Sequence, residues 1–123
     1  MQFTSKLIAF LTVLSFLADS ALAQSSDRDQ RDFWMLNNTG RVVVRAFISP
    51  HNVGSWGPDS LGSNDVLGDE NGMLITFNSD MPTSCVFDFR LVFDAGDVQE
   101  YLGGINLCKY RAVEFDDQTA VPF

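Results

Sequence analysis

Alternation between apolar and polar side chains is clearest in residues 84–94. Every second position in that segment is apolar: Cys85, Phe87, Phe89, Leu91 and Phe93. A period of two predicts a β-strand that turns these side chains toward a core and turns Asp88 and Arg90 outward as a charged pair. Residues 94–97 are typical of a hairpin turn, so residues 98–102 are predicted to form the partner strand.

Four further segments have strand character. Residues 41–49 are predicted to form a strand. One face carries Val42, Val44, Ala46 and Ile48, and the other carries Val43, Arg45 and Phe47. Residues 72–78 place Met73, Ile75 and Phe77 on one face, and residues 33–36 are a short apolar segment before a turn. A bend or bulge at Gly103-Gly104 precedes a final strand over residues 105–115. Because no segment has a long helical period, the predicted fold is all-β, a small antiparallel β-sandwich with one disulfide.

The first residues have the layout of a secretory signal. Lys6 is followed by the apolar residues 7–17 and by Ala21-Leu22-Ala23. The alternative is a membrane anchor, but the apolar run is shorter than the roughly 20 residues that a spanning helix needs. We expect a signal peptide over 1–23, a disordered leader over 24–32, a sandwich domain over 33–116 and a tail over 117–123. The protein is then exported, periplasmic or secreted, and has no membrane span.

The net charge of the chain limits the classes of partner that it is expected to bind. The net charge is −8, and an acidic surface repels phosphate backbones and anionic lipid. Nucleic acid and bare membrane are therefore excluded as expected partners, whereas cationic ligands and divalent metals are compatible. The expected partner is extracytoplasmic and of unknown identity, and the sequence does not determine the oligomeric state.

The cysteines are Cys85 and Cys108. An even number of cysteines in an oxidising compartment predicts a bridge within the chain. Free thiols, an intermolecular bridge and a two-cysteine metal site are the alternatives.

Several short motifs occur in one order along the chain. They are Asn38-Thr39-Gly40, Ser49-Pro50, the loop from Ser55 through Trp56-Gly57-Pro58-Asp59 to Leu61-Gly62, Cys85-x-x-Asp88-x-Arg90 and Asn106-Leu107-Cys108. Together they resemble a family of small exported bacterial proteins of unknown function, some of which carry the automatic name argininosuccinate lyase. The resemblance covers about residues 33–115 and implies a compact β-fold and export, with no established activity. Nothing in this short, β-rich chain supports the lyase name.

Catalytic residues are not evident. His51 is the chain's one histidine, and Ser49 and Ser55 lie near it in sequence. A serine–histidine mechanism needs an orienting acid and a rigidly held nucleophile, which the sequence does not identify, so an exposed loop histidine is the favoured interpretation. No nucleophile elbow, phosphate-binding loop or zinc-protease motif occurs. The protein is predicted not to be an enzyme.

The long segment 50–71 carries the remaining candidates. Asp59, Asp65, Asp69 and Glu70 supply oxygen ligands of the kind that Ca²⁺ takes, although no cofactor is required and a solvated acidic loop is favoured. Trp56, Asp59 and His51 form a candidate ligand loop. Trp56 is predicted to be a plug over an open end of the sandwich, with an exposed binding platform as the alternative.

Asn37-Asn38-Thr39 also matches the N-glycosylation sequon. A turn role for Asn37 explains the residue equally well. The sequence as a whole favours an exported, non-enzymatic β-sandwich that binds or scaffolds an unidentified ligand. A calcium-dependent adhesion or lectin-like module and a small secreted hydrolase are the alternatives.

Overall fold

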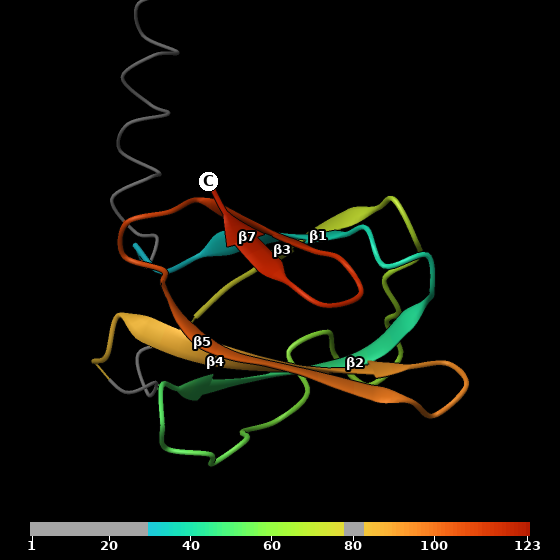
Figure 1. Ribbon diagram of the computed structural model, residues 1–123, viewed down its shortest axis with the longest axis horizontal. Coiled ribbons are helices and arrows are strands. Elements are labelled where there is room, and N and C mark those ends of the chain that lie inside the picture. Colours follow the sequence, from blue (N-terminus) through green and yellow to red (C-terminus); the bar gives the residue numbers. More distant parts are fainter. Residues whose placement is uncertain (1–29, 78–82) are drawn as a thin grey trace, which may run out of the picture.

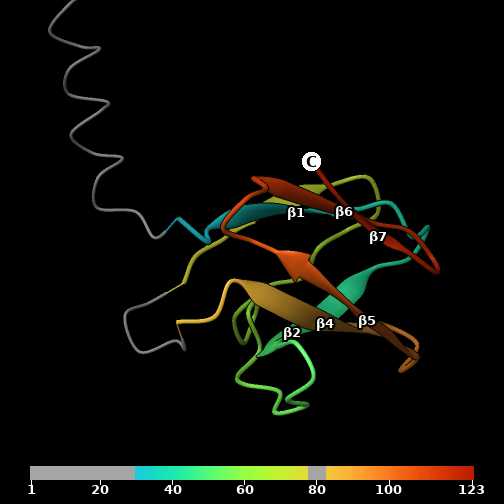
Figure 2. The same ribbon diagram turned by 60° about the vertical axis from the view of Figure 1, so that its left-hand side comes forward.

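Two β-sheets pack face to face in the computed structural model, which describes residues 30–77 and 83–123 (Figure 1). The strands are β1 Phe33–Asn37, β2 Val43–Pro50, β3 Gly72–Ile75, β4 Val86–Phe93, β5 Val98–Asn106, β6 Ala112–Phe115 and β7 Ala120–Pro122. One sheet has the order β3-β1-β6-β7, and the other has the order β2-β4-β5. The chain is therefore all-β, as predicted, although β1 and β6 pair in parallel. The turned view in Figure 2 shows the two layers separately.

The core lies between the sheets and is rich in phenylalanine. Phe89 of β4 is fully buried, and its ring makes edge-to-face contacts with Phe33 at 5.8 Å and with Phe115 at 5.2 Å between centroids. Both partners belong to the opposite sheet, so these rings hold the two layers together. The predicted alternation of β4 is confirmed on this face, where Phe87, Phe89, Leu91 and Phe93 are all buried.

The predicted faces of β2 are wrong at its start. The register with β4 shifts between Val43 and Arg45, which is a β-bulge. Because a bulge adds one residue to one strand, Val43 points inward together with Ala46 and Ile48, and Val44 leaves that face. Uninterrupted alternation had placed Val43 on the opposite face from Ala46 and Ile48.

The predicted final strand over residues 105–115 is also wrong. Ile105 and Asn106 end β5, and the chain then turns and crosses to the other sheet as β6. Gly103 and Gly104 fall where the β4–β5 register shifts, as expected of a bulge. The disulfide between Cys85 and Cys108 is confirmed, and it joins the start of β4 to the turn that follows β5.

Both ends of the described chain are more ordered than expected. Asp32 is buried, and its carboxylate accepts a hydrogen bond from the Phe77 backbone N–H at 2.8 Å; Arg31 is also buried. The leader therefore does not extend to residue 32. Strand β7 lies within the expected tail and pairs with β6. The predicted signal peptide and residues 24–29 of the leader lie outside the described residues.

A buried amide organises the turn after β1. The Asn37 side chain donates to the carbonyl oxygens of Arg41, at 2.8 Å, and Leu67, at 3.0 Å. Its own carbonyl oxygen accepts from the Thr39 hydroxyl at 2.7 Å and the Thr39 N–H at 3.1 Å. Since the amide nitrogen is buried and bonded to two carbonyl oxygens, Asn37 serves as a turn residue in the folded protein.

We expect Asn37→Ala to lower the free energy of unfolding by about 1–3 kcal/mol, because it leaves buried carbonyl groups without donors. Urea denaturation measures the loss. The matched control is Asn38→Ala, since Asn38 is exposed and its side-chain amide donates to the Glu114 carboxylate at 3.1 Å in an exposed contact. Equal stabilities of the two variants would contradict the structural role of Asn37.

Tyr101 of β5 makes the stability of the fold depend on pH in the alkaline range. Burial raises the pKa of Tyr101 to about 12 from 10.0, and the negative charge of Asp116 adds to the effect. The phenol donates to the Asp116 backbone carbonyl at 2.6 Å. The folded protein therefore keeps this proton at pH values where the unfolded chain has released it. This contribution to stability is complete below pH 10 and is lost as the pH rises toward 12.

In a Tyr110→Phe variant, Tyr101 is the remaining tyrosine. We expect its phenolate absorbance to appear near pH 12 in folded protein and near pH 10 in urea. A midpoint near 10 in the folded variant would show that burial does not protect the phenol.

Candidate functional site

The first part of the long connection between β2 and β3 folds across the outer face of the β2-β4-β5 sheet. In Figures 1 and 2 the green first part of this loop lies on the side of the sheet that faces away from the other sheet, and the yellow-green second part runs to the other sheet. The loop brings His51 over Asp88 and Trp56 over Arg90 on the outward face of β4. Asp59 instead bonds to the edge of β2 at Ala46. The polar side chains that alternation directs outward are therefore partly covered.

Asp88 and His51 form a hydrogen-bonded pair beneath this loop. The imidazole Nδ1 lies 2.8 Å from Asp88 Oδ1, and Asp88 Oδ2 accepts the Asn52 N–H at 3.1 Å. Asp88 lies on the outward face of β4, as predicted, but it is only 4% exposed because the loop covers it. His51 is one-third exposed and lies beside Gly104 of β5, where an added Cβ would come within 3.0 Å of the ring.

An imidazole held by a carboxylate is suited to proton transfer. The sequence did not reveal this acid, because Asp88 is 37 residues from His51. Ser49, however, is fully buried, and its hydroxyl donates to the Pro50 carbonyl at 3.2 Å. Ser49 is therefore not presented to a substrate as a nucleophile. Ser55 is exposed, and among the described residues it makes no hydrogen bond to His51.

Trp56 packs on β4 rather than over an open end of the sandwich. The Arg90 guanidinium carbon lies 5.6 Å from the centroid of its ring. Arg90 Nε is 3.0 Å from Glu100 Oε2, but the N–H is not aligned to donate, so the contact is ionic. The pair predicted between Asp88 and Arg90 is thus replaced by two separate pairs, one with His51 and one with Glu100.

In a Trp34→Phe background, Trp56 is the remaining tryptophan. We expect partly shielded emission and incomplete quenching by acrylamide, since Trp56 is half-buried. Trp56→Ala is expected to cost about 1–2 kcal/mol, which includes its contact with Arg90. Trp34→Ala is the control, because Trp34 is 49% exposed. Freely quenched emission with unchanged stability would make Trp56 a solvent-facing platform.

Two of the four acidic residues proposed for calcium have structural roles in separate places. Asp59 Oδ1 accepts from the Ala46 and Leu61 N–H groups, both at 3.0 Å. Asp69 Oδ1 accepts from the Gly40 N–H at 2.8 Å. Asp65 and Glu70 are exposed. Within residues 30–77 and 83–123, no group of three or more histidine, cysteine or acidic side chains is arranged to hold a metal ion. The calcium hypothesis therefore gains no support from these residues.

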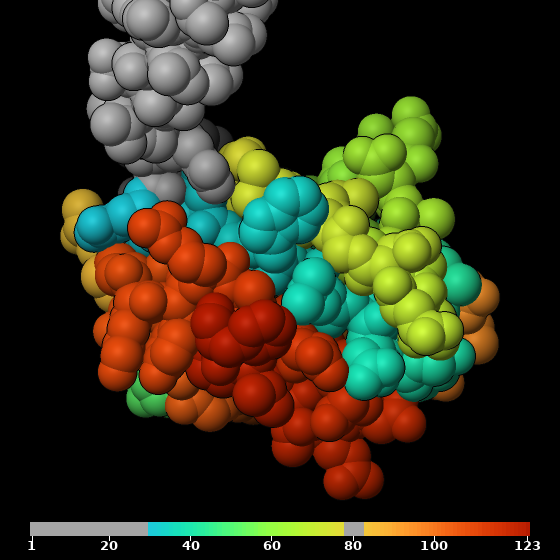
Figure 3. Space-filling view, turned by 90° about the horizontal axis from the view of Figure 1, so that it is seen from above, coloured from blue at the N-terminus to red at the C-terminus, as the bar shows by residue number. Residues whose placement is uncertain are grey.

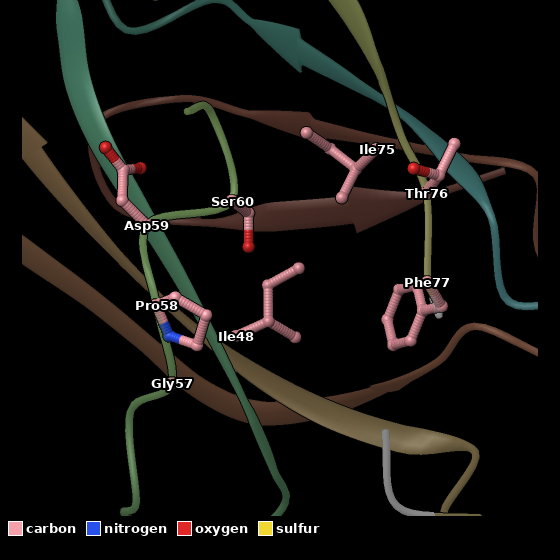
Figure 4. Close-up of a pocket in the computed structure, with 8 residues that line it drawn as sticks. All are labelled: Ile48, Gly57, Pro58, Asp59, Ser60, Ile75, Thr76 and Phe77. Carbon is pink, nitrogen blue, oxygen red and sulfur yellow. The ribbon is translucent and has the colours of Figure 1, made fainter. Parts of the chain in front are cut away.

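A cavity opens where the same loop meets the edges of both sheets. It has a volume of about 230 Å³ and is lined by Ile48 of β2, by Ile75, Thr76 and Phe77 at the end of β3, and by Gly57, Pro58, Asp59 and Ser60 of the loop. Figure 4 shows Ile48, Ile75 and Phe77 around one space, with Pro58 and Ser60 on the loop side. The walls are mainly apolar, and the polar groups lie on the loop and at Thr76.

Sequence reasoning identified Asp59 of this cavity and missed the others as site residues. Period two correctly predicted that Ile75 and Phe77 share a face, but a buried face and a cavity wall have the same sequence signature. The location of the gap depends on where the loop returns to β2. The hydrogen bond from the Ser60 N–H to the Ala46 carbonyl, at 2.7 Å, sets that point.

Among the described residues, no helix has the length and hydropathy needed to cross a membrane. Comparisons with protein-family models, curated proteins and solved structures found no match. The geometry of this small disulfide-bonded β-sandwich is therefore the basis for its proposed function.

Proposed function

We propose that the protein is an extracytoplasmic binding module, rather than an enzyme, and that its ligand inserts an apolar group into the cavity beside Ile48 and Ile75. The observation that carries this proposal is an apolar cavity of about 230 Å³ that opens between two sheet edges. Binding sites combine apolar walls with a few placed polar groups, and Asp59, Ser60 and Thr76 supply such groups here.

Two observations support the extracytoplasmic part of the proposal. The Cys85–Cys108 disulfide is consistent with an oxidising compartment. The Lys6 region, the apolar run and the Ala21-Leu22-Ala23 site have the form of an export signal. The motif resemblance to small exported bacterial proteins agrees with this assignment and names no activity.

The binding proposal is tested with a library of displayed ten-residue peptides selected on the purified, oxidised protein. The best binder is then synthesised with a fluorescein label and titrated by anisotropy. Ile48→Phe places a larger side chain in the cavity and is expected to weaken binding at least tenfold. Val44→Phe enlarges a residue of the same strand outside the cavity lining and is expected to leave affinity unchanged.

Amide shifts of ¹⁵N-labelled protein locate the bound peptide. We expect the largest shifts at Ile48, Ile75, Thr76 and Phe77. A selected peptide whose affinity is the same for wild-type protein and Ile48→Phe would refute the cavity as the binding site, and failure to select any peptide would refute a peptide as the ligand.

A further inference from the structure

We propose that the ligand is an extended, basic peptide segment of another protein, which adds as a strand to the free edge of β3 and inserts an apolar side chain into the cavity. This inference rests on the proposed binding function and names its ligand class. It follows from the size of the cavity, from the backbone groups beside it and from the charge around it.

The size of the cavity favours a side chain over a whole small molecule. Ligand pockets typically measure about 300–1,000 Å³, whereas this cavity measures about 230 Å³. An apolar amino-acid side chain fits such a space, and the rest of its chain must then lie across the opening. The protein groups that border the opening therefore determine how the rest of the ligand is bound.

The edge of β3 offers unpaired backbone groups at this opening. Trp34 of β1 directs its N–H to the Arg111 carbonyl on the β6 side, at 2.9 Å. Its antiparallel partner Leu74 consequently directs its N–H and C=O away from β1. Thr76, two residues on, faces the same way, because backbone direction alternates along a strand. Among the described residues, no backbone hydrogen bond reaches Leu74 or Thr76 on that side.

The other three sheet edges are protected, and β3 is not protected in the same ways. The loop between β2 and β3 covers the edge of β2. Leu67 forms hydrogen bonds with Val43, and Asp59 and Ser60 form hydrogen bonds with Ala46. The edge of β5 is interrupted by its bulge, and β7 carries Pro122, which has no N–H to donate. Bulges, prolines and covering loops are the usual means of blocking strand addition. Strand β3 contains none of them and is protected only by its short length.

An added strand would find apolar surface on both of its faces. Its inward side chains would enter the cavity beside Ile75. Its outward side chains would lie next to Leu74, which pairs with the half-exposed Trp34. Figure 3 shows the outer face of this sheet, with the yellow-green β3 segment beside the cyan segment that contains β1. The peptide is therefore expected to carry apolar side chains at successive inward and outward positions.

The acidic residues near β3 indicate the charge of the expected peptide. Asp69 and Glu70 are exposed immediately before β3, and Asp59 lines the cavity. The whole chain carries a net charge of −8. A basic peptide complements this surface, whereas edge-to-edge pairing of two copies would bring like charges together. A foreign basic segment is thus favoured over a second copy.

Strand addition has a signature that cavity binding alone lacks. In an added strand, every second amide of the peptide donates to β3 and the others point away. We therefore expect N-methylation of the selected peptide to weaken binding at least tenfold at alternate positions and to have little effect at the positions between them. The protein is unchanged in this experiment, so its folding is not in question.

Thr76→Pro tests the same edge from the protein side. It removes one outward N–H that has no described partner, and it is expected to weaken binding at least tenfold. Thr76→Val keeps the N–H and removes only the hydroxyl, so it is expected to weaken binding less than Thr76→Pro does. Circular dichroism checks that both variants are folded.

The outcomes separate the two proposals. A peptide blocked by Ile48→Phe but indifferent to alternate N-methylation and to Thr76→Pro would retain the cavity and overturn strand addition. A peptide whose affinity is unchanged by all of these substitutions and by N-methylation would overturn both proposals. Enrichment of acidic peptides, or sedimentation showing a dimer that Thr76→Pro dissociates, would overturn the basic foreign partner.

Discussion

Phe89→Ala is expected to lower the free energy of unfolding by about 3–5 kcal/mol. The ring is fully buried, and it contacts Phe33 and Phe115 of the opposite sheet. Truncation removes both edge-to-face contacts, each worth about 0.5–1.5 kcal/mol beyond burial, and leaves a cavity between the layers. Urea denaturation followed by circular dichroism measures the change.

Val92→Ala is the matched control on the same strand. Val92 points outward and is only half-buried, so its truncation should cost much less than that of Phe89. Asp88 is unsuitable as the inexpensive neighbour that simple alternation suggests, because its carboxylate is buried and bonded to His51 and Asn52. Removing it is expected to cost roughly 1.5–3 kcal/mol. Similar losses for Phe89→Ala and Val92→Ala would contradict the inward position of Phe89.

Replacing both cysteines by serine is expected to cost about 2–5 kcal/mol. The bridge joins residues separated by 23 positions, and it restricts the unfolded chain between the start of β4 and the turn after β5. Without the bridge, the unfolded state gains conformational entropy while the hydrogen bonds of the β4–β5 hairpin remain. The double variant avoids leaving a lone reactive thiol.

Wild-type protein in excess dithiothreitol should approach the stability of the double variant. Thiol labelling of unfolded, unreduced protein should find no free cysteine, as the bonded pair requires. A double variant as stable as oxidised wild-type protein would show that this bridge does not contribute to stability.

The sequence by itself determined the fold class, most strand positions and the disulfide pairing. Strand β4 was predictable because alternation depends only on local geometry: side chains two residues apart share a face. The cysteine pair was predictable because two cysteines allow one pairing within the chain. The turn at Asn37 was predictable as a turn, although its bonds to Arg41 and Leu67 were not.

The tertiary structure decided everything that depends on contacts between distant segments. The β2 bulge and the transfer of β6 to the other sheet reflect competition between pairings, which local pattern does not encode. Asp88 lies on the outward face, as alternation requires, but the loop over it made it a buried partner of His51. The cavity likewise exists because the loop returns to β2 at Ser60, leaving Ile48 and Ile75 facing a space that no described side chain fills. Alternation determines which face of a strand a residue occupies, and only the packing of the whole chain determines what covers that face.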